Sequence, residues 1–563
     1  MQIDYLENKN GEKIDLNKFT VLVGPNNAGK SRTLRDIHEH FTKGKNAKPT
    51  IMEKIGTSKP NSFDDVFTNL KVKDHPNSVG TKQISGVGSM LTSKDQVNFN
   101  FEQLEREFNQ SVDSSFTFGN IAKFRISYLD ADSRLNVAKR THSYNPYDDT
   151  PENLLQALYE AEAIEDELKK AFKTSFDMDL HLDSAGNQLC LRISKEFEEI
   201  PENPRKAVKV LKNYQILDDQ GDGYKSFIGV ILSLLLSKDR IVLLDEPEAF
   251  LHPAQAKQLG NWIAEHSTKI DGQIIVATHN SSFLSGILAS NQEVDIYRLN
   301  RNGDSTDFNL MPADATENLA KSPLLSSQRI LDAIFHSGVV VCEADADRAV
   351  YQTVATKEFN NNDLIFIHAH NKQTIPRVVK LFKEASIPVS SIADLDLINS
   401  QSLIELAELC FDANDEDLIE ELKEFQKKVS DEIVGAENQE ILENLTSEIQ
   451  DFLAQLTNEE HELSGARGAL KRLRNDSSDW KIMKVEGIDA FSDKLKEEAG
   501  QIISKLKEIG IFLPHVGELE GWMDLGTRQK NKWIVQALEE IHDGNTSEEL
   551  KDFVEEVLSF FEV

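Results

Sequence analysis

The chain has 563 residues, of which 39% are hydrophobic, and a formal net charge of −33 at pH 7. This length allows several hydrophobic cores, and domain statistics suggest roughly two to four units. The negative charge excludes diffuse electrostatic attraction to nucleic acid or to an anionic membrane, although metal ions and local basic patches can still receive a phosphate backbone.

The first residues lack the basic and apolar segments of a signal peptide, and the chain contains no run of about 18 apolar residues. Its three cysteines, Cys190, Cys342 and Cys410, are too far apart in sequence for a zinc motif or a disulfide framework. We therefore expect a soluble protein of the cytoplasm with no membrane partner.

A short apolar strand at residues 19–23 runs directly into the segment 24–31. Glycine at its first and sixth positions, followed by lysine and a hydroxyl residue, is the spacing of a phosphate-binding loop. Backbone N–H groups of such a loop surround the phosphates, while Lys30 reaches the β and γ phosphates and Ser31 ligates Mg²⁺. A helix is expected from Ser31 to about Phe41. The expected nucleotide-binding residues of the loop are Gly24, Asn26, Asn27, Gly29, Lys30 and Ser31.

The following stretch offers weaker signals. Residues 43 to about 120 are polar with weak periodicity, which predicts loops and short inserted elements. A strand is expected at residues 124–129, and Arg134 beyond it is expected in a surface salt bridge, with a phosphate contact as the alternative. An amphipathic helix is expected from Pro151 to about Phe172, with Thr150 as its N-cap.

Four consecutive aliphatic residues, 241–244, are typical of a strand that is buried on both faces. Asp245 and Glu246 follow directly. Ligands of an open α/β sheet bind beyond the carboxyl ends of its strands, so both carboxylates should face a bound ligand. A second buried strand, at residues 273–278, ends in His279.

Together these motifs resemble an ABC-type ATPase head of SMC-like and recombination proteins. The resemblance implies that Asp245 ends the Walker B strand and helps to hold Mg²⁺, that Glu246 polarises the attacking water, and that His279 senses the γ phosphate of ATP. It also implies a homodimer or higher homo-oligomer through the ATPase heads, in which the segment 221–226, ahead of an apolar helix at 227–236, caps ATP on a second subunit. No segment is assigned as the Q-loop.

A second α/β unit is expected from residue 338. Two of its buried strands, at 339–342 and 389–393, deliver acidic residues at their ends, and the alternation of strands and helices predicts a parallel sheet. Acidic side chains that meet at one edge repel each other unless cations lie between them, so the pattern predicts Mg²⁺ or Mn²⁺ for phosphodiester chemistry. The acidic residues are Glu343, Asp347, Asp394 and Asp396.

This segment resembles the Toprim fold of topoisomerases, primases and certain nucleases, although Ala344 and Asn371 stand where glycines are often found. An ATPase head followed by a Toprim domain is similar to the OLD family (overcoming lysogenisation defect), ATP-dependent nucleases that include phage-defence effectors. The resemblance implies that Glu520 joins the metal cluster. It also makes Lys532 a candidate to stabilise the pentavalent phosphate, with a solvent-exposed lysine as the alternative.

The sequence therefore predicts an α/β protein in which an ABC-type P-loop ATPase domain precedes a Toprim domain with a helical insertion. The expected segments are 1–310 for the ATPase domain, 311–337 for a helical connection, 338–400 for the first part of the Toprim domain, 401–475 for an acidic helical insertion, and 476–563 for the C-terminal part of the Toprim domain and terminal helices.

The insertion is acidic because residues 401–463 hold 19 Asp and Glu against three Lys. Apolar residues share one face around 418–429 and around 442–456, as in helices that pack into an intramolecular core. A dimer or partner surface is the alternative. The basic residues between Arg467 and Arg474 are either a solvated helix face or a contact for a phosphate backbone.

The leading hypothesis is an ATP-gated endonuclease that uses Mg²⁺ or Mn²⁺ to cleave DNA in anti-phage defence. The alternatives are a Toprim nuclease acting on RNA such as tRNA, and a nucleotide-switched scaffold whose companion defence protein is the effector. The expected catalytic residues are Glu246, Glu343, Asp347, Asp394, Asp396, Glu520 and Lys532. The expected metal ligands are Ser31, Asp245, Glu343, Asp347, Asp394, Asp396 and Glu520.

Overall fold

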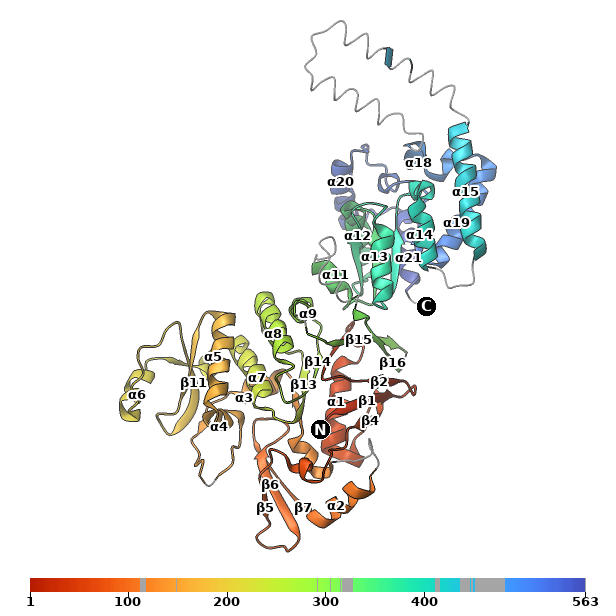
Figure 1. Cartoon of the computed structure of the whole chain (residues 1–563). Coiled ribbons are helices and arrows are strands. Elements are labelled where there is room, and N and C mark those ends of the chain that lie inside the picture. Colours follow the sequence, from red (N-terminus) through yellow and green to blue (C-terminus); the bar gives the residue numbers. More distant parts are fainter. Residues whose placement is uncertain are drawn as a thin grey trace. The chain divides into compact units, whose positions relative to one another are not determined.

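A computed structural model of the chain divides into two compact units, Met1–Phe335 and His336–Val563 (Figure 1). The structure describes residues 1–111, 118–147, 149–290, 292–303, 305–313, 315, 328–410, 416–435, 446, 449–450 and 481–561. The expected connection at 311–337 lies partly outside these residues, and its described part contains helix α11 (Gln328–Ala333).

A six-stranded sheet in the order β16-β15-β3-β14-β13-β8 forms the centre of the first unit, with all neighbours parallel except β15 and β16. Its inner strands bury nearly every side chain, as in parallel sheets that are covered on both faces. The strands are β3 (Phe19–Val23), β8 (Ile126–Leu129), β13 (Arg240–Asp245), β14 (Gly272–Ala277), β15 (Asp295–Asn302) and β16 (Ser305–Leu310).

Four helices of this unit, α1, α3, α8 and α9, are the next helices along the chain after β3, β8, β13 and β14. A fifth helix, α7, packs against α3. Asp245 pairs with Ala277 in the register of β13 and β14, so the residues that follow these two strands meet at one edge. The helices are α1 (Lys30–Lys43), α3 (Ala131–Val137), α7 (Asp222–Leu236), α8 (Pro253–His266) and α9 (Ser281–Leu288). Helix α7 begins earlier than the expected residue 227, with Gly221 as its N-cap.

Two three-stranded antiparallel sheets lie in the N-terminal part of this unit. The prediction of loops and short elements at 43–120 underestimates β6 and β7, seven residues each, because these strands bury little besides Ile84 and Val97 and so lack a strong alternation. The strands are β1 (Ile3–Asn8), β2 (Lys13–Asp15), β4 (Met52–Thr57), β5 (Val72–Asp74), β6 (Thr81–Val87) and β7 (Lys94–Asn100), followed by α2 (Phe101–Gln110).

The prediction of one helix from Pro151 to Phe172 is wrong, because two helices occupy this region, α4 (Leu154–Tyr159) and α5 (Glu162–Phe176). Asn153, not Thr150, is the first N-cap, since its side chain accepts a hydrogen bond from the backbone N–H of Gln156. A small antiparallel sheet and a further helix complete the unit. They are β9 (Thr141–His142), β10 (Asp179–Asp183), β11 (Gln188–Ser194), β12 (Gln215–Ile216) and α6 (Pro204–Leu211).

The second unit contains the predicted parallel sheet, with four strands in the order β18-β17-β19-β20. Its core includes Tyr351, Trp522 and Trp533, and the indole N–H of Trp522 donates to the Tyr351 hydroxyl at 3.0 Å. The elements are β17 (Gly338–Cys342), β18 (Leu364–His368), β19 (Val389–Ile392), β20 (Ile511–Phe512), α12 (Asp345–Phe359), α13 (Ile375–Glu384), α20 (Lys530–Asp543) and α21 (Glu548–Ser559).

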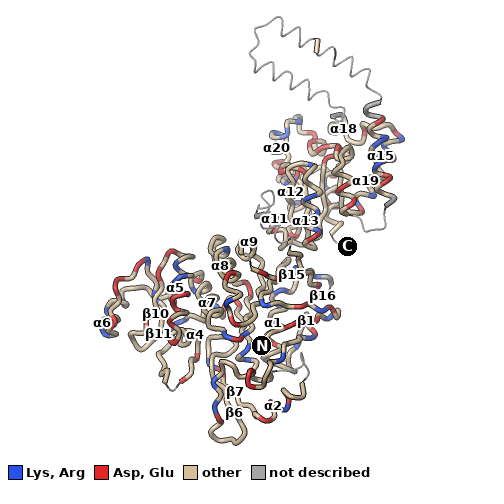
Figure 2. The backbone as a smooth tube through the Cα atoms, in the orientation of Figure 1, with Lys and Arg blue, Asp and Glu red and all other residues tan. Residues whose placement is uncertain are grey.

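Helices α14 (Gln401–Cys410), α15 (Glu416–Gly435), α18 (Lys481–Glu486) and α19 (Asp493–Glu508) belong to the insertion region and its C-terminal border. Side chains at 418, 422, 425 and 429 are buried, which confirms the first predicted apolar face. Acidic and basic residues are mixed along α15 and α19 (Figure 2), and Lys428 pairs with Glu498 at 2.5 Å. The second face, around 442–456, and the basic residues 467–474 lie outside the described residues, apart from positions 446, 449 and 450.

Among the helices that the structure describes, none combines the length and the apolar character needed to cross a membrane.

A pair of helical glycines tests the packing of α7. Gly229 faces α3, and a methyl group there would clash with the carbonyl oxygen of Arg134, whereas Gly500 in α19 faces open space. We expect Gly229→Ala to cost about 2 kcal/mol through overpacking, and Gly500→Ala to stabilise α19 by about 0.5–1 kcal/mol through helix propensity. Thermal unfolding of the two variants measures both effects. Equal midpoints would contradict the close packing of α7 on α3.

Candidate functional site

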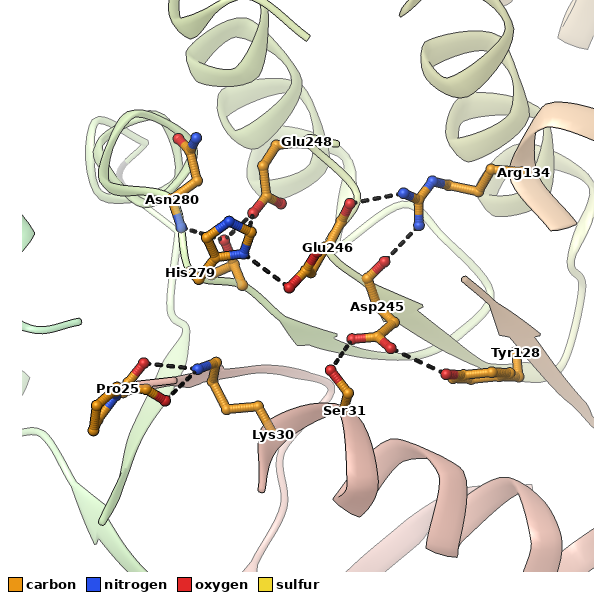
Figure 3. A network of polar contacts seen from close by, with 12 residues as sticks. Pro25, Lys30, Ser31, Tyr128, Arg134, Asp245, Glu246, Glu248, His279 and Asn280 are labelled. Atoms are coloured by element: carbon orange, nitrogen blue, oxygen red, sulfur yellow. Dashed lines mark hydrogen bonds and ion pairs between the residues drawn. The ribbon is translucent and has the colours of Figure 1, made fainter. Parts of the chain in front are cut away.

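The phosphate-binding loop has the backbone conformation that its glycines permit. Gly24 and Gly29 have φ angles of 135° and 101°, and α1 begins at Lys30 directly after the loop. The Lys30 ammonium donates to the carbonyl oxygens of Gly24 at 2.7 Å and Pro25 at 2.8 Å (Figure 3). Burial lowers its pKa to about 8. The exposed Asn26 and Asn27 complete the expected set of this loop.

Asp245 ends β13 close to the first residues of α1. The Ser31 hydroxyl donates to its Oδ1 at 2.7 Å, and the Tyr128 hydroxyl donates to its Oδ2 at 3.0 Å (Figure 3). Burial raises the pKa of Asp245. A hydroxyl and a carboxylate beside a phosphate-binding loop are suitable ligands for the Mg²⁺ of a nucleotide. Tyr128 was not predicted, because nothing local to the strand at 124–129 shows that it faces β13.

Glu246 and His279 meet at the same sheet edge. Glu246 adopts a φ of 51°, and its carboxylate lies 2.9 Å from Nδ1 of His279 (Figure 3). This contact lowers the pKa of Glu246 and raises that of His279. Behind them, Glu248 is buried, accepts a hydrogen bond from Thr278 at 2.7 Å, and has its pKa raised by burial. The arrangement can hold a water-activating carboxylate next to a cationic partner.

Arg134 corrects the prediction of a surface salt bridge, because its side chain is completely buried. Its guanidinium donates to the backbone carbonyls of Asp245 and Glu246, in the latter case at 2.8 Å (Figure 3). Its Nε donates to the Ser226 hydroxyl at 3.3 Å. These contacts fix the backbone that carries both acidic side chains and connect it to the first turns of α7. The carbonyl groups lie more than a hundred residues away in sequence, so no local signal reveals this role.

Replacing Arg134 by lysine tests this positioning role while a cation is retained. Lysine cannot reproduce the planar set of donors, so Glu246 should be less well placed for activating water. We expect kcat for ATP hydrolysis to fall at least about tenfold, with little change in nucleotide affinity. Steady-state ATPase assays and nucleotide titration separate the two quantities. A fall in affinity with an unchanged kcat would contradict the assignment.

In the second unit, three of the predicted acidic residues gather at the carboxyl edge of the sheet. Glu343 follows β17, while Asp394 and Asp396 follow β19, and each offers a ligand atom that lies within 4.8 Å of the others. Asp347, in the first turn of α12, accepts a hydrogen bond from the backbone N–H of Ala344 at 2.9 Å. Asp347 and the buried Glu520, in the 3-10 helix at Leu519–Gly521, lie outside this group of three.

Lysine side chains compensate these carboxylates. Lys372 Nζ lies 2.9 Å from Asp396 Oδ2, Lys484 Nζ lies within 3.5 Å of both Asp394 and Asp396, and Lys530 Nζ lies 3.9 Å from Asp347 Oδ1. Lys532, the predicted phosphate-stabilising residue, is instead exposed and forms no ion pair within the described part of the chain. Lys530 begins α20, and residues two apart on a helix point in nearly opposite directions, so only one of these lysines can face the cluster.

The electrostatics and the unpaired oxygens of the cluster fit a hard divalent cation. Burial, together with the neighbouring acids, raises the pKa of Glu343 to about 7 and that of Asp347 to about 6. Glu343 Oε2, Asp347 Oδ1 and Asp396 Oδ1 are buried and accept no hydrogen bond from the residues that the structure describes, although Lys530 Nζ lies 3.9 Å from Asp347 Oδ1. Buried carboxylate oxygens without donors need a cation, and oxygen ligands are those that Mg²⁺ prefers.

Comparison with known families assigns both units. Residues 19–285 match the family described as "AAA domain, putative AbiEii toxin, Type IV TA system". Residues 334–396 match the family described as "Overcoming lysogenization defect protein-like, TOPRIM domain". The two domains imply the use of a nucleotide and a divalent metal, and they support a nuclease-type function.

A curated relative is the probable ABC transporter ATP-binding protein p29 of Mesomycoplasma hyorhinis, 29% identical over 115 residues. The match covers 19% of this chain and 45% of that protein, less than half of its length.

Two solved structures are similar to the chain at low TM-scores. The SMC head bound to the C-terminal winged-helix domain of ScpA has 14% identity and a TM-score of 0.33, and covers 56% of this chain and 98% of its own.

The SMC head domain of Thermotoga maritima has 13% identity and a TM-score of 0.29, and covers 56% of this chain and 100% of its own. The family assignments confirm the predicted order of a P-loop ATPase domain and a C-terminal Toprim domain. With the phosphate-binding loop in the first and the clustered carboxylates in the second, the chain has the ATPase-plus-Toprim architecture of the OLD family.

Proposed function

We propose that the protein is an ATP-gated, divalent-metal-dependent endonuclease that cleaves DNA in defence against phage. The observation that carries this proposal is the group of Glu343, Asp394 and Asp396, whose ligand atoms lie within 4.8 Å of one another. In this group, Glu343 Oε2 and Asp396 Oδ1 are buried and accept no hydrogen bond from any residue in the described part of the chain. A purely structural acidic group would be expected to satisfy these oxygens with donors of the protein.

Each side chain of the Toprim site has a role in this proposal. Glu343, Asp394 and Asp396 would hold the metal, and Asp347 and Glu520 would extend the ligand set. A metal bound there would supply an activated water and charge stabilisation at the leaving 3′ oxygen. Lys530 replaces Lys532 as the cation closest to Asp347, and its position suits contact with a substrate phosphate.

The ATPase unit supplies the gate. Lys30, Ser31 and Asp245 hold the nucleotide and its Mg²⁺, while Glu246 activates water and His279 orients Glu246 through their 2.9 Å contact. Gly221, the N-cap of α7, and Asp222, its first residue, are exposed and can contact a nucleotide on a second subunit. ATP bound between two heads would then alter the Toprim sites through differential binding to two states of the dimer.

Two substitutions separate the two activities. Asp394→Asn removes one metal-binding charge and should abolish DNA cleavage in Mg²⁺ or Mn²⁺ while ATP hydrolysis continues. Lys30→Ala removes the phosphate contact and should weaken ATP binding by at least about tenfold. Gel assays with labelled DNA, run beside ATPase assays and nucleotide titration, measure all three quantities, and Lys532→Ala is the control for loss of an exposed lysine.

The same assay distinguishes the alternatives. Full cleavage by purified Asp394→Asn protein would overturn the assignment of the nuclease site. If the wild type cleaves tRNA but not DNA, the substrate is RNA and not DNA. If it cleaves neither, with or without added metal, the scaffold alternative is favoured. Chelation with EDTA should stop cleavage, and added Mg²⁺ should restore it, because the carboxylates provide the expected ligands.

A further inference from the structure

Lys484 lies against the metal-binding carboxylates although it is distant from them in sequence. Its ammonium is 3.3 Å from Asp396 Oδ2 and 3.5 Å from Asp394 Oδ2. Burial lowers its pKa, but the neighbouring Asp396, Asp394 and Glu343 outweigh that effect, so the pKa is raised overall. The side chain is 35% exposed, so its ammonium faces both the carboxylates and the solvent.

The position of Lys484 is built into the fold. The 3-10 helix Gly487–Ala490, which directly follows α18, is fixed on the loop that leads to Glu520, because the Ile488 N–H donates to the His515 carbonyl at 2.9 Å. Gly517, with a φ of 94°, packs so closely that a side chain there would clash with the carbonyl oxygens of Met483 and Lys484. Both terminal nitrogens of Arg528 donate to the Val485 carbonyl at 3.1 Å. Many surface lysines form loose ion pairs on mobile segments, but the backbone that carries Lys484 is fixed beside the carboxylates.

A divalent cation changes the partners available to this lysine. The metal needs the carboxylate oxygens of Asp394 and Asp396 that Lys484 contacts, and its two positive charges repel the ammonium at short range. Lysine has a long flexible stem with a compact charge, so Lys484 can leave the carboxylates without movement of α18. The anion that approaches a metal-loaded nuclease site is the substrate phosphate.

We propose that Lys484 is a phosphate-binding residue of the nuclease site that becomes available when the metal binds. Without metal it pairs with Asp394 and Asp396, and with metal it contacts a DNA phosphate. Nucleic-acid binding by this acidic protein is therefore conditional on metal loading. The inference rests on the proposed nuclease function and adds a residue, and an order of binding, to it.

The test uses the full chain and a fluorescein-labelled DNA duplex, with Ca²⁺ in place of Mg²⁺ to limit cleavage, and with EDTA as the metal-free condition. Fluorescence anisotropy gives the affinity of the wild type, of Lys484→Gln and of the control Lys532→Gln. We expect Ca²⁺ to raise the affinity of the wild type and of the control about tenfold or more, and Lys484→Gln to lose most of that gain.

The salt dependence reports the phosphate contact itself. In Ca²⁺, the slope of log affinity against log salt should be smaller by about one for Lys484→Gln than for the wild type, with no difference in EDTA. Titration calorimetry with Mn²⁺ should show metal binding by Lys484→Gln that is as tight as in the wild type or tighter, since a competing cation has been removed.

Two results would overturn the role of Lys484. One is Mn²⁺ binding that weakens about tenfold in Lys484→Gln, which would make the lysine a structural support of the cluster. The other is a metal-dependent DNA affinity that is unchanged by the substitution or absent from the wild type. The nuclease assignment has its own test, and it fails if Asp394→Asn protein still cleaves DNA.

Discussion

Parallel strands bring acidic side chains together in both units, and the repulsion between these partly desolvated charges is the constraint on which both sites depend. In the ATPase unit, β13 and β14 end in register, so Asp245, Glu246 and His279 share one sheet edge. In the Toprim unit, β17 and β19 are neighbours, and Glu343, Asp394 and Asp396 converge in the same way. Each site must therefore supply compensating positive charge or donors.

The two units compensate their acids by different means. The ATPase unit uses donors of several kinds, since Ser31 and Tyr128 donate to Asp245, His279 pairs with Glu246, and Arg134 holds the peptide groups beneath them. The Toprim unit uses lysine side chains on flexible stems. Fixed donors suit a site that must keep one geometry during hydrolysis. Lysines can be displaced by a metal and can then serve a phosphate, which suits a site that binds its ligands in sequence.

Much of this arrangement could be predicted from sequence, because the informative patterns are local. The phosphate-binding loop, the buried strands that end in acidic residues and the strand–helix alternation each lie within a short window. The residues that sequence reasoning missed act over long separations. Arg134 reaches the backbone of β13, and Lys484 reaches Asp394 across 90 residues. Lys532 is a candidate from the family resemblance, with a solvent-exposed lysine as the alternative, and in the structure it is Lys530 that lies near Asp347. Which of these two lysines faces the cluster depends on where α20 begins, and the sequence does not show that residue.

The location of the bound metal is the most direct test of the proposed nuclease site. Crystals of the full chain soaked in Mn²⁺ and measured near the manganese absorption edge would show anomalous density wherever the ion binds. We expect a peak within coordinating distance of Glu343, Asp394 and Asp396, with the Lys484 ammonium withdrawn from both aspartates. Mn²⁺ density confined to the phosphate-binding loop, with Lys484 still paired to Asp394 and Asp396, would contradict the proposed nuclease site.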